Sequence, residues 1–253
     1  MPEDSLGTKR ALLLIESLAA KSEAGISELS KQFGWSKGIV HRLLSSLVEM
    51  GYAEQVPETE KYRLTTKLFQ VGSAVVNRTG ITQAALPVME MLQAKTGETI
   101  NLAILDHGEV IYVQKVDSME PVREDIRIGT RFPAHCTALG KALLAHQTKG
   151  ELAAILQNLR LVQRTPNTIT DARRLLDELA SIRQQGYAVD NEELSIGLRC
   201  VAASIRNGNG KAVAALSIAG PSTRLSDDRI PPLAQLVKEG ASIISGKLGY
   251  PPA

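Results

Sequence analysis

The sequence has 253 residues, 43% of them hydrophobic, and a formal net charge of +2 from 29 Lys and Arg against 27 Asp and Glu. This length allows two hydrophobic cores, and the near balance of charges excludes an overall basic field, so any contact with nucleic acid must come from locally placed side chains. The two cysteines, Cys136 and Cys200, are too few for a secreted disulfide framework, and we expect a reducing, cytoplasmic environment. No uninterrupted apolar run of about 18 residues occurs, so we expect no membrane partner.

The first 65 residues predict a small domain of three helices and a hairpin. Apolar residues recur at helical spacing in three segments, residues 8–21, 27–33 and 36–50. Gly51 ends the third helix, and two alternating segments, residues 52–56 and 61–65, predict a β-hairpin around residues 57–60. This order indicates a winged helix-turn-helix in residues 1–65. A linker helix follows over residues 66–78 and ends at Gly80, so that the linker occupies residues 66–80.

The remaining residues, 81–253, predict a larger α+β domain. We expect strands at residues 99–105, 110–116, 126–129, 187–191, 201–206 and 212–219. We expect helices at residues 82–95, 137–146, 151–157, 172–185 and 228–247. Strands and helices mixed in this order are typical of a sheet with helices packed on it.

The third helix has one apolar and one polar face. With Ser36 as its N-cap, a rotation of about 100° per residue separates an apolar arc around Val40 and Leu44 from a polar arc. The polar arc holds Lys37, Gly38, His41, Arg42 and Ser45. Arg and His side chains there suit base edges in a major groove, while Ser36, Lys37 and the helix N-terminus suit phosphate oxygens. The alternative is an ordinary amphipathic surface helix.

The hairpin also carries positive charge on one face. Lys61 and Arg63 alternate with Tyr62 and Leu64, so the two basic side chains share a face of the strand. One interpretation is a wing that contacts phosphates or the minor groove. The other is solvated charges that protect an edge strand from aggregation. The sequence leaves both open.

Several segments resemble the IclR family of bacterial transcriptional regulators. In the N-terminal domain these are residues 25–30, 36–44, 51–52 and 61–64. In the second domain they are residues 131–145, with the sequence RFPAHCTALGKALLA, residues 186–188 with 191–193, and residues 197–202. The similarity covers about residues 8–246. The chain departs from the family at Glu60, where a glycine is common in the wing turn, and a positive φ is unfavourable without glycine.

This resemblance implies a GAF-like second domain with a central antiparallel sheet and a pocket for a small organic effector, and no further cofactor. Carboxylates, aromatic acids and sugar-acid breakdown products are typical effectors of the family. The positions that match the family's pocket are Phe132, Ala138, Leu139, Asp190, Leu198, Cys200 and Ser217. A neighbouring position is often Ser in the family but is Ala219 here. Free N–H groups in the first turn of the helix after Thr137 would independently favour a carboxylate.

The resemblance also implies a homodimer joined through the first helix and the linker, with a second pairing of effector domains into a tetramer. Two recognition helices related by a twofold axis would bind an inverted repeat in double-stranded DNA. We expect a repressor, and no enzyme.

Two other functions are open to the same C-terminal residues. Cys200, His135 and Asp190 have the residue types of a thiol hydrolase, although nothing in the sequence fixes their geometry. A metal sensor would use these three with Cys136, but no pair among them has the spacing typical of metal ligands.

Overall fold

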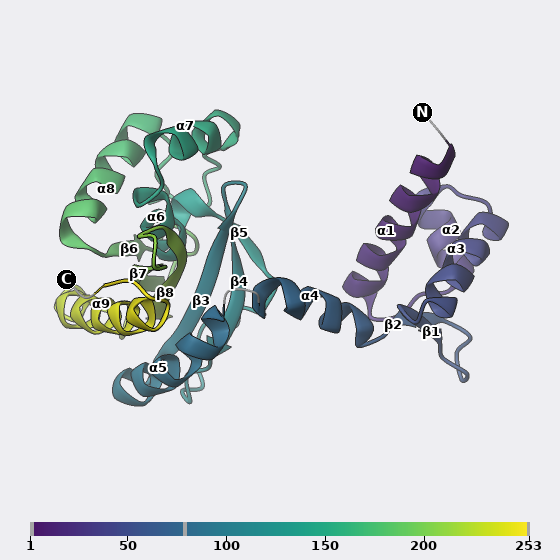
Figure 1. The fold of residues 1–253 in the computed structure, drawn as a ribbon, viewed down its shortest axis with the longest axis horizontal. Coiled ribbons are helices and arrows are strands. Elements are labelled where there is room, and N and C mark those ends of the chain that lie inside the picture. The colour runs from purple at the N-terminus through teal and green to yellow at the C-terminus, as the bar shows by residue number, and fades with distance from the viewer. Residues whose placement is uncertain (1–2, 78–79, 252–253) are drawn as a thin grey trace. The chain divides into compact units, whose positions relative to one another are not determined.

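The computed structural model describes residues 3–77 and 80–251, and the chain divides into two compact units (Figure 1). The first unit runs to Arg78 and the second starts at Thr79, so the expected linker helix belongs to the first unit. The expected end of that helix at Arg78 and the outer ends of both expected domains lie outside the described residues. Over the described ranges, no helix is long and apolar enough to cross a membrane.

The first unit is a winged helix-turn-helix followed by one more helix. Its elements are α1 (Glu3–Lys21), α2 (Ile26–Phe33), α3 (Lys37–Glu49), β1 (Ala53–Gln55), β2 (Tyr62–Leu64) and α4 (Lys67–Asn77). Its core consists of fully buried aliphatic side chains from the first three helices, including Leu14, Leu29, Val40 and Leu44. These residues are the apolar arcs of their helices, which confirms the three predicted helices.

The wing is shorter than expected and is joined to the segment between α1 and α2. Tyr62, the residue of β2 next to the turn, exchanges two backbone hydrogen bonds with Ala24. The turn is closed by the Val56 N–H, which donates to the Lys61 carbonyl oxygen over 2.7 Å. Glu60 has a φ of +56°, so this turn keeps the left-handed geometry without glycine.

The second unit is built on one six-stranded antiparallel sheet with the strand order β5-β4-β3-β8-β7-β6. The strands are β3 (Thr99–Asp106), β4 (Glu109–Val116), β5 (Arg131–Pro133), β6 (Ala188–Asn191), β7 (Leu198–Arg206) and β8 (Ala212–Pro221). The helices are α5 (Ile81–Thr96), α6 (Ala138–Ala145), α7 (Lys149–Asn158), α8 (Ala172–Gln185) and α9 (Ile230–Lys247), with a short 3-10 turn at Ala134–Cys136. The predicted α+β class and antiparallel sheet are confirmed.

Each face of this sheet is covered by its own helices. Helices α5 and α9 pack on the face that carries Ile100, Leu102 and Ile218, and α6 packs on the opposite face (Figure 1). The α6 face is lined by smaller residues such as Ala103 and Ala202. Because both faces are buried, the central strands are apolar almost throughout. The helix α6 therefore lies directly over the face on which the candidate effector residues are found.

The predicted strand at residues 126–129 is wrong. Gly129 adopts a φ of +88°, and the Thr130 N–H donates to the Arg127 carbonyl oxygen, so this segment turns. The edge strand is instead β5, where Phe132 pairs with Val110 of β4. The apolar alternation at residues 126–128 only reflects the burial of Ile126 in the core beneath α6.

Candidate DNA-binding surface and effector site

The polar face of α3 is exposed, as the arc analysis predicts. Five residues of that arc lie in solvent: Lys37, Gly38, His41, Arg42 and Ser45. Ser36 is the N-cap, and its hydroxyl accepts a hydrogen bond from the Ile39 N–H over 3.4 Å. Within the described residues, neither Lys37 nor Arg42 has a carboxylate partner, so both cations are free to meet an anion.

The two basic residues of the wing have partners. Arg63 Nε lies 2.7 Å from Glu54 Oε1 on the opposite strand, and Lys61 Nζ lies 3.4 Å from Glu23 Oε1. Lys61 also lowers the pKa of the Glu28 carboxyl, after the larger effect of a hydrogen bond from the Gly25 N–H. The wing cations are therefore partly neutralised within their own unit, unlike those of α3.

A basic residue that the sequence analysis did not select lies beside the C-terminal end of α3. Lys67, the first residue of α4, donates a hydrogen bond from Nζ to the Met50 carbonyl oxygen over 2.6 Å. The same Nζ lies 4.8 Å from the centre of the Tyr52 ring. No sequence signal marks it, because its partner is a backbone oxygen.

The polar residues of the predicted effector set lie on neighbouring strands of the second unit. Asp190 on β6 pairs with Cys200 on β7, and Ser217 on β8 pairs with Ala202 on β7. Since Cys200 and Ala202 both belong to the core cluster beneath α6, alternation places all of these side chains on the α6 face. Asp190, Cys200 and Ser217 are buried. The structure thus brings these three residues together on one face.

The remaining predicted residues pack around the same cluster. Ala138 and Leu139 are buried in the first turn of α6, while Phe132 and Leu198 are half-buried at its edge. The Phe132 ring meets that of Tyr112 edge to face at 5.9 Å. The hydroxyl of Thr137 accepts the Gly140 N–H over 3.1 Å, so Gly140 is not available to a ligand. The N–H groups of Ala138 and Leu139 have no partner among the described residues.

Two polar residues that the sequence analysis missed lie on this face as well. Asn101 on β3 pairs in register with Ser217, and its Nδ2 donates to Glu124 Oε2 over 2.5 Å. Burial raises the pKa of the Glu124 carboxyl to about 7. Asn101 Oδ1 and Ser217 Oγ are both fully buried and have no hydrogen-bond partner among the described residues. The sequence signal for this pair is Asn101 itself, a polar residue within the apolar strand segment 99–105. Because buried polar groups need hydrogen-bond partners, such a residue indicates a polar site in the core.

A buried ion network lies beside the predicted set. Lys141 on α6 is 1% exposed, and its Nζ lies 2.5 Å from Glu193 Oε1 and 3.0 Å from Glu178 Oε1. The cavity next to it, of about 630 Å³, is lined by Lys141, Glu193 and Arg199 among others. None of the seven predicted effector residues lines this cavity. Five of the seven are buried, and Phe132 and Leu198 are half-buried, so the predicted set does not open to this cavity.

The geometry does not assemble a thiol hydrolase. His135 Nε2 lies 3.1 Å from the Val162 carbonyl oxygen, and among the described residues His135 forms no hydrogen bond with a cysteine or with Asp190. Burial raises the pKa of the Cys136 thiol to about 12 and that of the Cys200 thiol well above its ordinary value, so both thiols are neutral. In residues 3–77 and 80–251, no three His, Cys, Asp or Glu side chains are placed to hold a metal ion. The metal-sensor alternative thus gains no support from this part of the chain.

Comparison with known proteins gives matches along nearly the whole chain. Residues 7–57 match a family profile described as IclR helix-turn-helix domain, and residues 73–246 match one described as bacterial transcriptional regulator IclR C-terminal. The chain is 37% identical to the HTH-type transcriptional regulator KdgR of Dickeya chrysanthemi over 98% of this chain and 82% of KdgR. It is 32% identical to the acetate operon repressor of Salmonella typhimurium over 93% of this chain and 87% of that protein.

Solved structures agree with these matches. The Thermotoga maritima IclR has a TM-score of 0.83 and 34% identity, covering 96% of this chain and 98% of that one. An IclR homolog from Microbacterium hydrocarbonoxydans, complexed with 4-hydroxybenzoate, has a TM-score of 0.82 and 25% identity, covering 94% and 98%. These relatives are regulators and not enzymes, so the hydrolase alternative is wrong. The chain belongs to the IclR family of bacterial transcriptional regulators, and it is a DNA-binding regulator of transcription.

Proposed function

We propose that this regulator is a cytoplasmic repressor of catabolic genes whose affinity for DNA changes when the second unit binds a small organic carboxylate. Repression is supported by the similarity to the acetate operon repressor. A carboxylate is supported by the structural neighbour in complex with 4-hydroxybenzoate, and by the two unpartnered N–H groups at the start of α6. Binding can act on DNA only through a difference in ligand affinity between two arrangements of the protein.

The exposed, unpaired cations of α3 are the observation that carries the DNA-binding part of the proposal. His41 and Arg42 point outward from the middle of the helix, where side chains reach base edges. Apart from the neighbouring backbone of α3 itself, no atom of the described residues lies within 4 Å of the position that a Cβ on Gly38 would take, so duplex backbone can approach there. The proposed contact residues are Ser36, Lys37, Gly38, His41, Arg42, Ser45, Lys61 and Arg63. For Lys61 and Arg63, phosphate would have to replace Glu23 and Glu54 as partners.

The test uses the full chain and duplexes selected by it from a random library. We expect an inverted repeat with half-sites about one helical turn apart, 34–36 Å. Arg42→Ala should weaken binding of the selected duplex by about 1–3 kcal/mol, roughly 5- to 150-fold, and relax the base preference at one position of each half-site. Arg173→Ala, an exposed arginine on α8, is the matched control and should bind as the unchanged protein does. Unaltered affinity and base preference in Arg42→Ala would reject α3 as the recognition element.

The effector part of the proposal rests on the polar groups beneath α6. The ligand carboxylate would accept hydrogen bonds from the N–H groups of Ala138 and Leu139, and the buried hydroxyl of Ser217 would contact its other end. Asp190 and Cys200 would complete the polar surface, and Phe132 and Leu198 the apolar rim. Since the polar groups of this site are buried, ligand entry requires a covering segment to move.

Thermal-shift measurements with acetate, pyruvate, gluconate and 4-hydroxybenzoate test this site. A ligand present at 100 times its Kd stabilises the folded state by about 2.7 kcal/mol and so raises the Tm measurably. Cys200→Leu should abolish that rise while leaving binding to the selected duplex intact. Gly150→Ala, on α7 with open space around it, is the control. An unchanged ligand response in Cys200→Leu would remove this face of the sheet from consideration.

We further propose that two chains pair through α1 and α4, and that two pairs join through their effector domains. Large apolar side chains are exposed on both helices: Leu6, Leu12 and Leu13 on α1, and Phe69 and Val71 on α4. Exposed apolar patches of this kind mark protein interfaces. Light scattering of the full chain should give the mass of a tetramer, and Phe69→Asp should reduce it. A monomer at micromolar concentration would contradict the proposal.

A further inference from the structure

Another cavity of the second unit, which we call the effector unit, is lined by several basic side chains. It has a volume of about 370 Å³ and lies where the C-terminal ends of α6 and α8, the end of β7 and one face of α9 meet. Its lining includes His146, Arg183, Arg206, Lys238, Ser204 and Ser242. No aspartate or glutamate is among the described residues that line it.

The cations of this cavity are held in place by neutral groups. Arg183 Nε donates to the Ala145 carbonyl oxygen, and Arg206 Nη1 donates to that of Gly210. The Arg206 guanidinium lies 5.7 Å from the centre of the Tyr250 ring. Lys238 Nζ lies 5.9 Å from the ring of Tyr187. None of the three cations has a carboxylate within 4.0 Å in the described part of the chain, so their charges are oriented but not neutralised.

The positive charges of Arg206 and Arg183 affect the protonation of the neighbouring His146. His146 contributes its ring to the cavity, and its Nδ1 lies 2.9 Å from the Ala142 carbonyl oxygen. Burial lowers the pKa of His146, and the positive charges of Arg206 and Arg183 lower it further. The cavity thus has a positive potential, since like charges disfavour the protonation of the imidazole.

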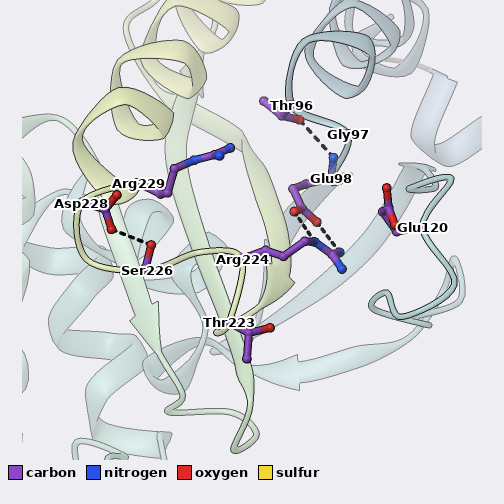
Figure 2. Close-up of a pocket in the computed structure, with 9 residues that line it drawn as sticks. All are labelled: Thr96, Gly97, Glu98, Glu120, Thr223, Arg224, Ser226, Asp228 and Arg229. Carbon is purple, nitrogen blue, oxygen red and sulfur yellow. Dashed lines mark hydrogen bonds and ion pairs between the residues drawn. The ribbon is translucent and has the colours of Figure 1, made fainter.

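A different cavity of the same unit, at the C-terminal end of α5, contains an arginine whose charge is neutralised. There Arg224 binds Glu98 through two hydrogen bonds of 2.7 Å, one from Nε and one from Nη2 (Figure 2). Glu98 is almost fully buried, so this pair ties the end of α5 to the segment after β8. Arg183 and Arg206 have no such carboxylate, and their charge is left for a partner outside the chain.

We propose that this cavity binds a small multivalent anion of phosphate chemistry. Guanidinium groups match the geometry of phosphate oxygens, and the hydroxyls of Ser204 and Ser242 supply further donors. The volume of about 370 Å³ accommodates inorganic phosphate or a small phosphate ester. Arg206 lies six residues from Cys200 along β7, about 20 Å at 3.3 Å per residue, so this site is separate from the proposed effector pocket.

Calorimetric titration of the full chain with inorganic phosphate, and separately with glycerol 3-phosphate, tests the proposal, with sodium chloride holding the ionic strength constant. We expect saturable binding that Lys238→Gln and Arg206→Gln each weaken at least tenfold. Arg173→Gln, on α8 and ten residues or about 15 Å from Arg183, should leave the affinity unchanged. Tighter binding of glycerol 3-phosphate would identify a phosphorylated metabolite as the ligand, and equal binding would identify inorganic phosphate.

Two results would overturn the proposal. One is a titration in which phosphate binds Lys238→Gln as tightly as it binds the unchanged protein, because the proposed site requires that side chain. The other is a change of oligomeric mass in Lys238→Gln with no phosphate binding to the unchanged protein, which would make this surface a contact between chains. Neither result depends on the carboxylate response of the proposed effector site.

Discussion

Lys67 Nζ, at the start of α4, donates a hydrogen bond of 2.6 Å to the carbonyl oxygen of Met50, at the end of α3. A cation at this position donates a hydrogen bond to a carbonyl that has no partner within the helix. Its positive charge also interacts favourably with the negative C-terminal end of the helix dipole. Because α4 is the last helix of the first unit, this bond joins α3 directly to the segment that leads to the second unit.

Lys67→Met should therefore loosen the end of α3. The loss of one charge-assisted hydrogen bond at an exposed position removes about 1 kcal/mol. Hydrogen exchange of the Met50 region should accelerate about fivefold, since 1.4 kcal/mol corresponds to a factor of ten. Lys95→Met is the control, because Lys95 is an exposed lysine in the last turn of α5. If exchange in residues 46–52 were equal in both variants, the bond would have no energetic role.

The wing turn stores strain at Glu60. Its φ of +56° is unfavourable for a side chain with a Cβ, by about 1 kcal/mol relative to glycine. Glu60→Gly should therefore stabilise the DNA-binding unit by about that amount in thermal or urea unfolding. Glu58→Gly removes the same charge from the same turn at a residue without a positive φ, and should instead be destabilising. A stabilisation of equal size in both variants would assign the effect to charge and not to backbone geometry.

The α3 surface could be predicted from sequence because it depends on local periodicity. Val40 and Leu44 are fully buried and His41 and Arg42 are exposed, as a rotation of 100° per residue requires. The hydroxyl of Ser36 caps the helix three residues ahead of its partner, which is also a local relationship.

The polar centre of the second unit could not be predicted in the same way. Asn101 and Glu124 are 23 residues apart, and Lys141 and Glu193 are 52 apart, so neither contact leaves a periodic pattern. Lys141 resembles a surface lysine in an amphipathic helix, yet it is almost completely buried because two carboxylates balance its charge. The alternation of apolar and polar residues at 126–128 led to the wrong prediction of a strand. Such alternation indicates which side chains are buried, and a buried side chain does not require the backbone to form a strand.

Gly140 is required by the packing of α6. A Cβ at this position would lie 2.2 Å from the Ala134 carbonyl oxygen, and backbone atoms cannot move aside as a flexible side chain can. Gly140→Ala should lower the free energy of unfolding of the effector unit by at least about 3 kcal/mol. Gly150→Ala places the same methyl group in open space in α7 and should be neutral or stabilising by up to about 1 kcal/mol. Comparable unfolding of the two variants in urea would refute this steric account.

Glu124 makes the stability of the effector unit dependent on pH. Burial raises the pKa of this carboxyl to about 7 from an ordinary value near 4.5, so the folded protein binds a proton that the unfolded chain has released. The resulting stability is fully present below pH 4.5 and is lost as the pH rises through 7. A shift of this size corresponds to about 3 kcal/mol at most.

Glu124→Gln removes this ionisation and keeps an oxygen that accepts the hydrogen bond from Asn101 Nδ2. The variant should be more stable than the unchanged protein at pH 8 and nearly equal to it at pH 5, as measured by urea unfolding at both values. The part of the pH dependence due to Asp190, whose pKa burial also raises to about 7, should persist in the variant. Glu90→Gln, an exposed carboxyl on α5, controls for the loss of one negative charge. Parallel pH profiles for Glu124→Gln and the unchanged protein would mean that Glu124 ionises as freely as a surface carboxyl.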